Sequence, residues 1–199
     1  MIKLQYKLIL ILGLLIFCNS LVAQNKPQLE IVQADSTWFK EIISFPIDWA
    51  PDLTLDGFEE LRFSPKWDEP ESPQFWTLAL SWKVNTQNAL SLEEIQFNLA
   101  HYFDGLMKPN HWATEFAKPK VTLQLTEVEN EITHYIGHMD FFDGFHTGKP
   151  ISTYFNATQW FCKASESTIV VFLISSQEKT HSIWEELITI VPIHTACPK

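Results

Sequence analysis

The sequence predicts an α+β fold, with a mainly antiparallel sheet and two amphipathic helices packed on one of its faces. Short segments that alternate apolar and polar residues, which is typical of strands, fill much of the chain after residue 37. Two segments have helical periodicity instead, and each follows a group of strands. No linker rich in glycine and serine divides the chain, so we expect residues 24–199 to form one domain.

The predicted strands are rich in β-branched and aromatic residues and end at prolines or polar turns. In residues 75–84, for example, Trp76 and Trp82 share one face with the two leucines between them, as on the apolar side of a strand. The predicted strands cover residues 38–45, 58–63, 75–84, 121–126, 132–142, 151–162 and 168–174.

The first helix is predicted over residues 91–106. Ser91 and Glu94 have the spacing of a capping box, in which a hydroxyl and a carboxylate satisfy two free backbone amides. Apolar residues at helical intervals form one stripe after this cap, and Pro109 follows the end of the pattern. This segment has the most complete set of helix signals in the chain.

The second helix is predicted over about residues 180–191, where Ser182 and Glu185 repeat the capping-box spacing. Each helix would then close a strand, strand, helix segment, and the triplet Asp-Gly-Phe opens both segments at residues 56–58 and 143–145. An internal duplication would explain this pattern. Because only three residues match, we prefer a single undivided domain.

The first 23 residues have the pattern of a secretory signal peptide. Lys3 and Lys7 precede an apolar run at residues 8–17, and Ala23 is a small residue at a suitable cleavage point. The run is shorter than the ~20 apolar residues that a membrane span needs. We expect cleavage after Ala23, export to the periplasm or the cell exterior, and no membrane span in the mature chain; an uncleaved anchor is the alternative.

The charge of the chain argues against nucleic-acid partners. Removal of residues 1–23 deletes two lysines and no acidic residue, which changes the net charge from −10 to −12. Arg62 is the only arginine. A chain with this balance repels phosphate backbones and anionic lipid surfaces.

Export would leave Cys162 and Cys197 as the two cysteines of the mature chain. Pairing is the default in an oxidising compartment, so we predict a disulfide between them. Two separate buried thiols are the alternative. Neither cysteine lies in a recognisable nucleophile motif.

Residues 134–146 contain the densest group of candidate metal ligands. On a strand His134, His138 and Asp140 share one face, but side chains four residues apart start about 13 Å apart. His138 and Asp140, about 7 Å apart, could share an ion if the following turn folded His146 back toward them. We favour the solvated face of a half-buried strand, with no metal and no cofactor. The alternative is a metal-dependent or general acid–base hydrolase.

Three tryptophans are candidate ligand-binding residues. Trp49, Trp67 and Trp112 lie in predicted loops beside prolines or acidic residues, and flat aromatic faces stack well on apolar ligand surfaces. The chain has no Gly-x-Ser-x-Gly elbow, phosphate-binding glycine loop or His-Glu-x-x-His motif. These features favour a non-enzymatic protein that binds a small molecule or a protein partner, while the hydrolase alternative stays open.

The run from Glu59 to Trp67, followed by Phe75-Trp76 and later by Cys162 and Cys197, resembles segments of small exported proteins from Gram-negative bacteria. Those proteins have no assigned function. The resemblance touches most of the mature chain. It implies export and a compact α+β fold, and it identifies no catalytic residue.

Overall fold

The computed structural model describes residues 29–108 and 116–193 of the chain. The predicted signal peptide (residues 1–23), Trp112 and Cys197 lie outside this part of the chain, so the predictions that depend on them stay predictions. No helix within the described residues is long and apolar enough to cross a membrane.

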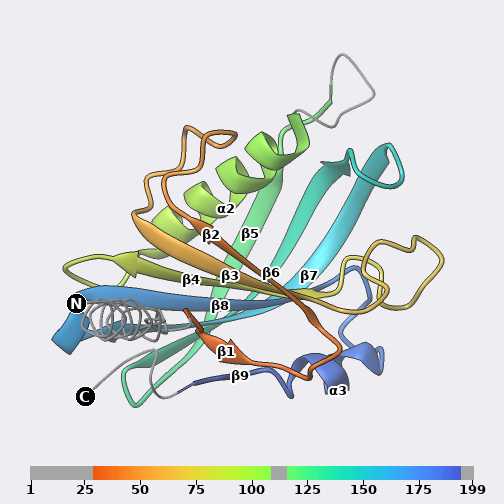
Figure 1. Cartoon of the computed structure of the whole chain (residues 1–199). Coiled ribbons are helices and arrows are strands. Elements are labelled where there is room, and N and C mark those ends of the chain that lie inside the picture. The colour runs from red at the N-terminus through yellow and green to blue at the C-terminus, as the bar shows by residue number, and fades with distance from the viewer. Residues whose placement is uncertain (1–28, 109–115, 194–199) are drawn as a thin grey trace, which may run out of the picture.

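Seven strands in the described part of the chain form one antiparallel sheet, in the order β2-β3-β4-β8-β7-β6-β5 (Figure 1). The first three strands therefore make one half of the sheet and the last four make the other, with β4 beside β8 in the middle. The mainly antiparallel α+β class is confirmed. The strands are β2 (Phe39–Ser44), β3 (Gly57–Phe63), β4 (Leu78–Asn85), β5 (Lys120–Glu129), β6 (Ile132–Asp143), β7 (Lys149–Cys162) and β8 (Ser167–Ser175).

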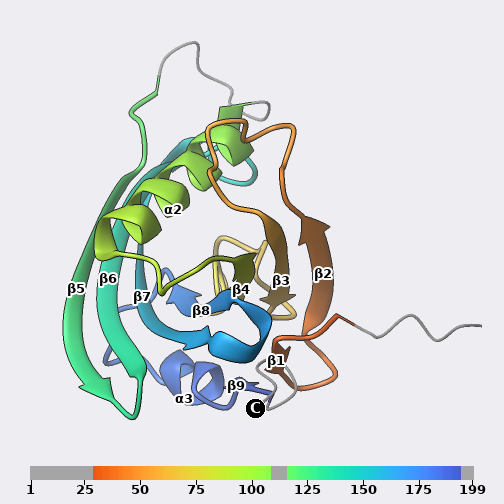
Figure 2. The same ribbon diagram turned by 90° about the vertical axis from the view of Figure 1, so that its left-hand side faces the viewer.

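The sheet is strongly curved, and helix α2 (Leu92–Met107) lies inside the curve (Figure 2). Gly137 of β6 leaves room for the ring of its cross-strand partner Phe155 on β7, because a Cβ at Gly137 would lie 2.1 Å from that ring. The edge strand β5 has a register shift between Leu125 and Glu127, and such irregularities bend a strand. Both features fit a sheet that wraps around α2.

Helix α2 begins at the cap that the sequence predicts. The Ser91 hydroxyl accepts a hydrogen bond from the Glu94 amide (3.1 Å), and the Glu94 carboxylate accepts one from the Ser91 amide (2.7 Å). The helix packs against β5 and β6 and contributes Ile95, Leu99 and Phe103 to the larger hydrophobic core. This element was therefore predicted correctly from its cap and its periodicity.

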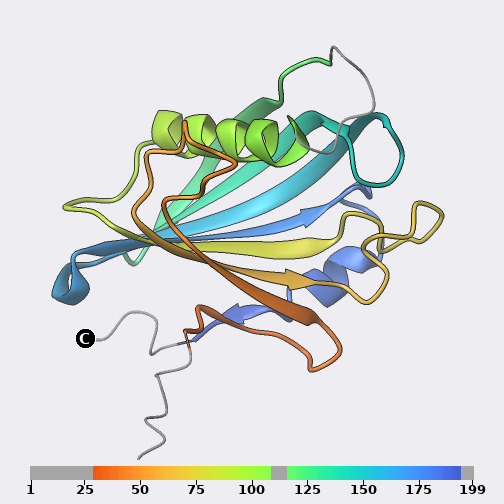
Figure 3. The same cartoon turned by 45° about the horizontal axis from the view of Figure 1, so that its top comes forward.

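The prediction of two helices on one face of the sheet is wrong. Helix α3 (Ile183–Leu187) has only five residues and no side-chain cap. It packs in a second cluster with Ala79 of β4, whereas Leu80 of the same strand faces α2 in the larger core. Because successive strand residues point to opposite faces, α2 and α3 cover opposite faces of the sheet (Figure 3).

The second helix is short because the apolar residues after it belong to a strand. Val191–Pro192 forms β9, which pairs antiparallel with β1 (Val32–Gln33) in a separate two-stranded sheet. The side chain of Ile190, which also fits a helical stripe, is buried in the second cluster. The structure does not confirm a strand, strand, helix duplication, since a 16-residue helix and a five-residue helix lie on opposite faces.

A buried carboxylate fixes the start of the described chain to the sheet. Glu60 accepts hydrogen bonds from the amides of Ile31 and Val32, and Arg62 donates to its other oxygen at 2.7 Å. The only arginine of the sequence therefore balances a carboxylate that has no solvent exposure. These contacts lie on the α3 side of the sheet, which leaves the concave side to α2 and the loops.

Candidate functional site

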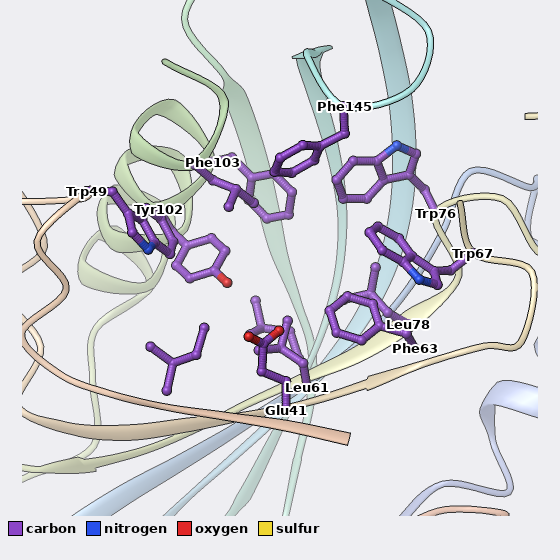
Figure 4. Close-up of a pocket in the computed structure, with 13 residues that line it drawn as sticks. Glu41, Trp49, Leu61, Phe63, Trp67, Trp76, Leu78, Tyr102, Phe103 and Phe145 are labelled. Carbon is purple, nitrogen blue, oxygen red and sulfur yellow. The ribbon is translucent and has the colours of Figure 1, made fainter. Parts of the chain in front are cut away.

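An apolar cavity of about 250 Å³ lies between α2 and the β2–β3–β4 half of the sheet (Figure 4). Helix α2 packs mainly on β5 and β6, so the space above the other half of the curved sheet is only partly filled, by large side chains that come from loops as well as from the strands and the helix. Leu61 and Phe63 of β3 and Leu78 and Leu80 of β4 line the sheet side of the cavity. The helix supplies Tyr102, Phe103 and Leu106.

Two of the three tryptophans predicted to bind a ligand line this cavity from opposite sides. Trp49 belongs to the β2–β3 loop, and its ring packs edge-on against Tyr102 with centroids 5.1 Å apart. Trp67 belongs to the β3–β4 loop, and its ring centroid is 4.6 Å from that of Phe63. Figure 4 shows the two indoles across the cavity from each other. The third candidate, Trp112, lies outside the described residues.

The position of Trp49 depends on close contact between its loop and α2. A Cβ at Gly105 would lie 2.5 Å from the Trp49 carbonyl oxygen and 2.8 Å from the Cα of Ala50. Further along the loop, the Asn98 side chain accepts a hydrogen bond from the Thr54 amide (2.9 Å). The glycine and the asparagine of α2 therefore hold the loop against the helix.

Trp76 also lines the cavity, and its backbone is strained. Its φ of +48° lies in the left-handed region, which costs a bulky residue about 1–3 kcal/mol. Its amide donates to the Trp67 carbonyl (2.8 Å), and its buried ring packs on Phe141 with centroids 4.9 Å apart. Such strain persists only where surrounding contacts hold it, and it is frequent at ligand sites.

A turn built around Asp143 brings Phe145 to the cavity. The buried Asp143 carboxylate accepts hydrogen bonds from the amides of Phe145 and His146, both at 3.2 Å. It also accepts from the amide and hydroxyl of Thr147, at 2.8 and 2.7 Å. One carboxylate therefore satisfies the polar groups of the turn while the Phe145 ring joins the cavity lining.

The structure separates the residues considered as a metal site. His138 Nε2 lies 3.2 Å from Asp140 Oδ1, and both belong to the face of β6 opposite the buried Met139. His146 lies on the other side, where its ring centroid is 5.0 Å from that of Trp67. Within residues 29–108 and 116–193, no group of three His, Cys, Asp or Glu residues is placed to hold a metal ion.

A further buried carboxyl group, that of Glu59, lies one hydrogen bond away from the cavity lining. The Tyr102 hydroxyl donates to Glu59 Oε1 at 2.9 Å, and both side chains are buried. Burial raises the pKa of Glu59 to about 8, and the hydrogen bond from Tyr102 opposes that rise. Glu59 Oε2 has no hydrogen-bond partner within the described residues, although Trp82 is its neighbour on β4. Glu59 is therefore mainly protonated at neutral pH.

Among the described residues that line the cavity, Glu41 is the only one with a carboxylate. It lies on the edge strand β2, and Figure 4 shows its carboxylate directed into the cavity. Burial is the main cause that raises the pKa of both Glu59 and Tyr102, and the charge of Glu41 adds a smaller rise to each. The electric field of Glu41 therefore reaches the inner wall of the cavity.

Sequence reasoning missed most of the cavity lining. The sequence pattern places Phe63 in a strand and Tyr102 in a helix, where aromatic residues are expected in a core, and no motif marks Glu41 as a site residue. A usable signal for Glu41 was the alternation of β2, which places it on the same face as Ile43. No pattern among neighbouring residues in the sequence indicates that these residues line the same cavity as Trp49 and Trp67.

The chain matches no protein-family model, no curated protein and no solved structure. The cavity is therefore the main indication of what the protein does. Its lining offers flat aromatic faces, branched aliphatic side chains and one carboxylate. These groups are suited to binding a small molecule with an apolar body.

Proposed function

We propose that this chain is an exported, non-enzymatic protein that binds a small molecule with an apolar body in the cavity between α2 and the sheet. The observation that carries the proposal is the position of Trp49 and Trp67, which come from two loops and line the same apolar cavity. Export is part of the proposal because residues 1–23 have the pattern of a signal peptide.

The size and the lining of the cavity fit a small ligand. An apolar cavity of about 150 Å³ is enough to bind benzene. The cavity here, at about 250 Å³, has room for a substituted aromatic ring. Burial of apolar ligand surface contributes roughly 25 cal/mol per Å². Because the rings already pack against one another, little ordering is needed on binding.

The hydrolase alternative has less support. It requires His146 to join His138 and Asp140, but His146 lies on the opposite side of the sheet from the other two residues. We also propose no nucleic-acid partner, in keeping with the net charge of −10.

The test is a fluorescence titration of the mature protein with N-phenyl-1-naphthylamine, a neutral dye that brightens when it leaves water. We expect saturable binding of one dye per chain. Trp67→Ala removes one wall of the cavity and should weaken binding at least ten-fold, which is the loss expected for a large buried contact of about 1.4 kcal/mol.

The matched control is Trp160→Ala. Trp160 is also a partly buried tryptophan, but it packs with the second cluster on the α3 side of the sheet. This variant should bind the dye as the wild type does. Absence of saturable binding, or equal losses in both variants, would contradict the proposed function.

A further inference from the structure

We propose that the ligand is an organic cation, with an apolar or aromatic body in the cavity and an amine or quaternary ammonium group beside Glu41. This inference rests on the proposed function, because it assigns a chemical class to the ligand of the same cavity. It follows from the arrangement of charges around the lining and from the number of aromatic rings in it.

Neither β2, which contains Glu41, nor the neighbouring strand β3 directs a cationic side chain toward the Glu41 carboxylate. Lys40, the preceding residue, points to the opposite face of the sheet and pairs with Glu30 at 2.8 Å. Arg62 of β3, the cross-strand neighbour of Lys40, pairs with Glu60 on that same face. Among the ion pairs of the described residues, none includes Glu41.

The side of β2 and β3 that faces the cavity is apolar around Glu41. Ile43 is the next residue on that face of β2, and Leu61 is the direct cross-strand neighbour of Glu41. A carboxylate in such surroundings is complementary to a cation that brings its own apolar body. Glu41 is exposed on the edge strand, so the charged group of such a ligand can reach it at the solvent side of the cavity while the apolar body lies inside.

The aromatic lining favours a cation as well. The face of a tryptophan or tyrosine ring attracts an ammonium group within about 6 Å of the ring centroid, and the attraction grows where water is excluded. Trp49 and Tyr102 lie together on the helix side of the cavity, and Figure 4 shows the Glu41 carboxylate directed toward the same space. Quaternary ammonium groups are bound in this way by cages of aromatic rings.

The buried carboxyl group behind Tyr102 does not compete with Glu41 for the cation. Glu59 is fully buried and is not part of the cavity lining. Its oxygen Oε1 already accepts the hydrogen bond from Tyr102. The negative charge available to a ligand in this cavity is therefore that of Glu41.

The test compares two probes of the same shape. Benzyltrimethylammonium is cationic, and neopentylbenzene is its neutral isostere, with carbon in place of nitrogen. Each probe displaces N-phenyl-1-naphthylamine from the mature protein at low salt. We expect the cation to bind about ten-fold more tightly than the isostere. Glu41→Gln should abolish this preference by weakening the binding of the cation.

The matched control is Glu127→Gln, which removes an exposed glutamate from β5, the opposite edge strand, with the same change in net charge. It should keep the preference for the cation. Equal binding of both probes, or equal losses in the two variants, would overturn the assignment of a cationic ligand while dye binding still supports the proposed function. Failure of the dye and of both probes to bind would overturn the two together.

Discussion

The hydroxyl of Tyr102 on α2 donates a 2.9 Å hydrogen bond to the carboxyl group of Glu59 on β3. Helix α2 otherwise packs mainly on β5 and β6, at the other half of the sheet. The bond therefore links the helix to the half of the sheet that lines the cavity. Because both groups are buried, their protonation states affect the free energy of folding.

Glu59 should make the protein less stable as the pH rises from about 5 to about 8. The pKa of Glu59 is about 8 in the folded chain, against 4.5 for the free side chain. Between these values the folded state keeps a proton that the unfolded state releases, so each pH unit removes about 1.4 kcal/mol of stability. Urea unfolding at a series of pH values measures this slope.

Glu59→Gln isolates the contribution of this carboxyl group from that of other titrating groups. Glutamine has the shape of the protonated acid and cannot ionise. The wild type should be more stable at pH 5.5 than at pH 8.5, and in the variant this difference in unfolding free energy should disappear. The same slope in variant and wild type would mean that Glu59 keeps an ordinary pKa.

Gly105→Ala should displace Trp49 and weaken dye binding. The new Cβ would lie 2.5 Å from a backbone oxygen and 2.8 Å from a Cα of the β2–β3 loop, so the loop must move. We expect a loss of about 1–3 kcal/mol in unfolding free energy, despite the better helix propensity of alanine. Thermal unfolding and the dye titration together measure both effects. Glu93→Ala, an exposed change in the first turn of the same helix, should leave dye binding unchanged and cost at most about 1 kcal/mol.

Asp143→Ala should release the turn that carries Phe145. The change removes the acceptor of four hydrogen bonds, three of them from backbone amides. We expect a loss of about 3 kcal/mol in urea unfolding, together with weaker dye binding. Asp143→Asn keeps an acceptor oxygen and the side-chain shape, so its loss should be smaller. Equal stability of the alanine variant and the wild type would show that the turn does not need the carboxylate.

We predict that Cys162 and Cys197 form a disulfide in the exported protein. Cys162 is buried at the end of β7 in the second cluster, and Ile193, shortly before the C-terminal tail, packs against the same cluster. A closed loop of roughly 36 residues corresponds to about 4 kcal/mol in the chain-entropy model. Thiol labelling of the denatured, unreduced protein should find almost no free cysteine. Two reactive thiols per mature chain would contradict the pairing.

Local patterns in the sequence predict most of the strands and α2. Alternation over 132–142 places Tyr135 and Met139 on the core side of β6, as observed. The capping box at Ser91 defines the start of α2 to within a residue. In each of these cases the signal and the structure involve neighbouring residues, so no tertiary information was needed.

The errors arise where tertiary contacts override the local pattern. Residues 75–77 fit the alternation of β4, but the strand begins at Leu78 because Trp76 adopts a left-handed backbone conformation. The sequence does not predict this conformation, since the position holds neither glycine nor asparagine. Val191 fits a helical stripe and instead pairs with Gln33. The cavity could not be predicted for a related reason, since Trp49 and Trp67 come to line the same cavity only because the sheet curves around α2.

The most direct test of the account is a crystal structure of the mature protein with N-phenyl-1-naphthylamine bound. The proposed function predicts difference density for the dye between Trp49 and Trp67, in contact with Tyr102 and Phe63. Density for the dye on the other face of the sheet, for example over the exposed Ile136 and Ile188, would contradict it, because that face belongs to neither the aromatic lining nor the cavity.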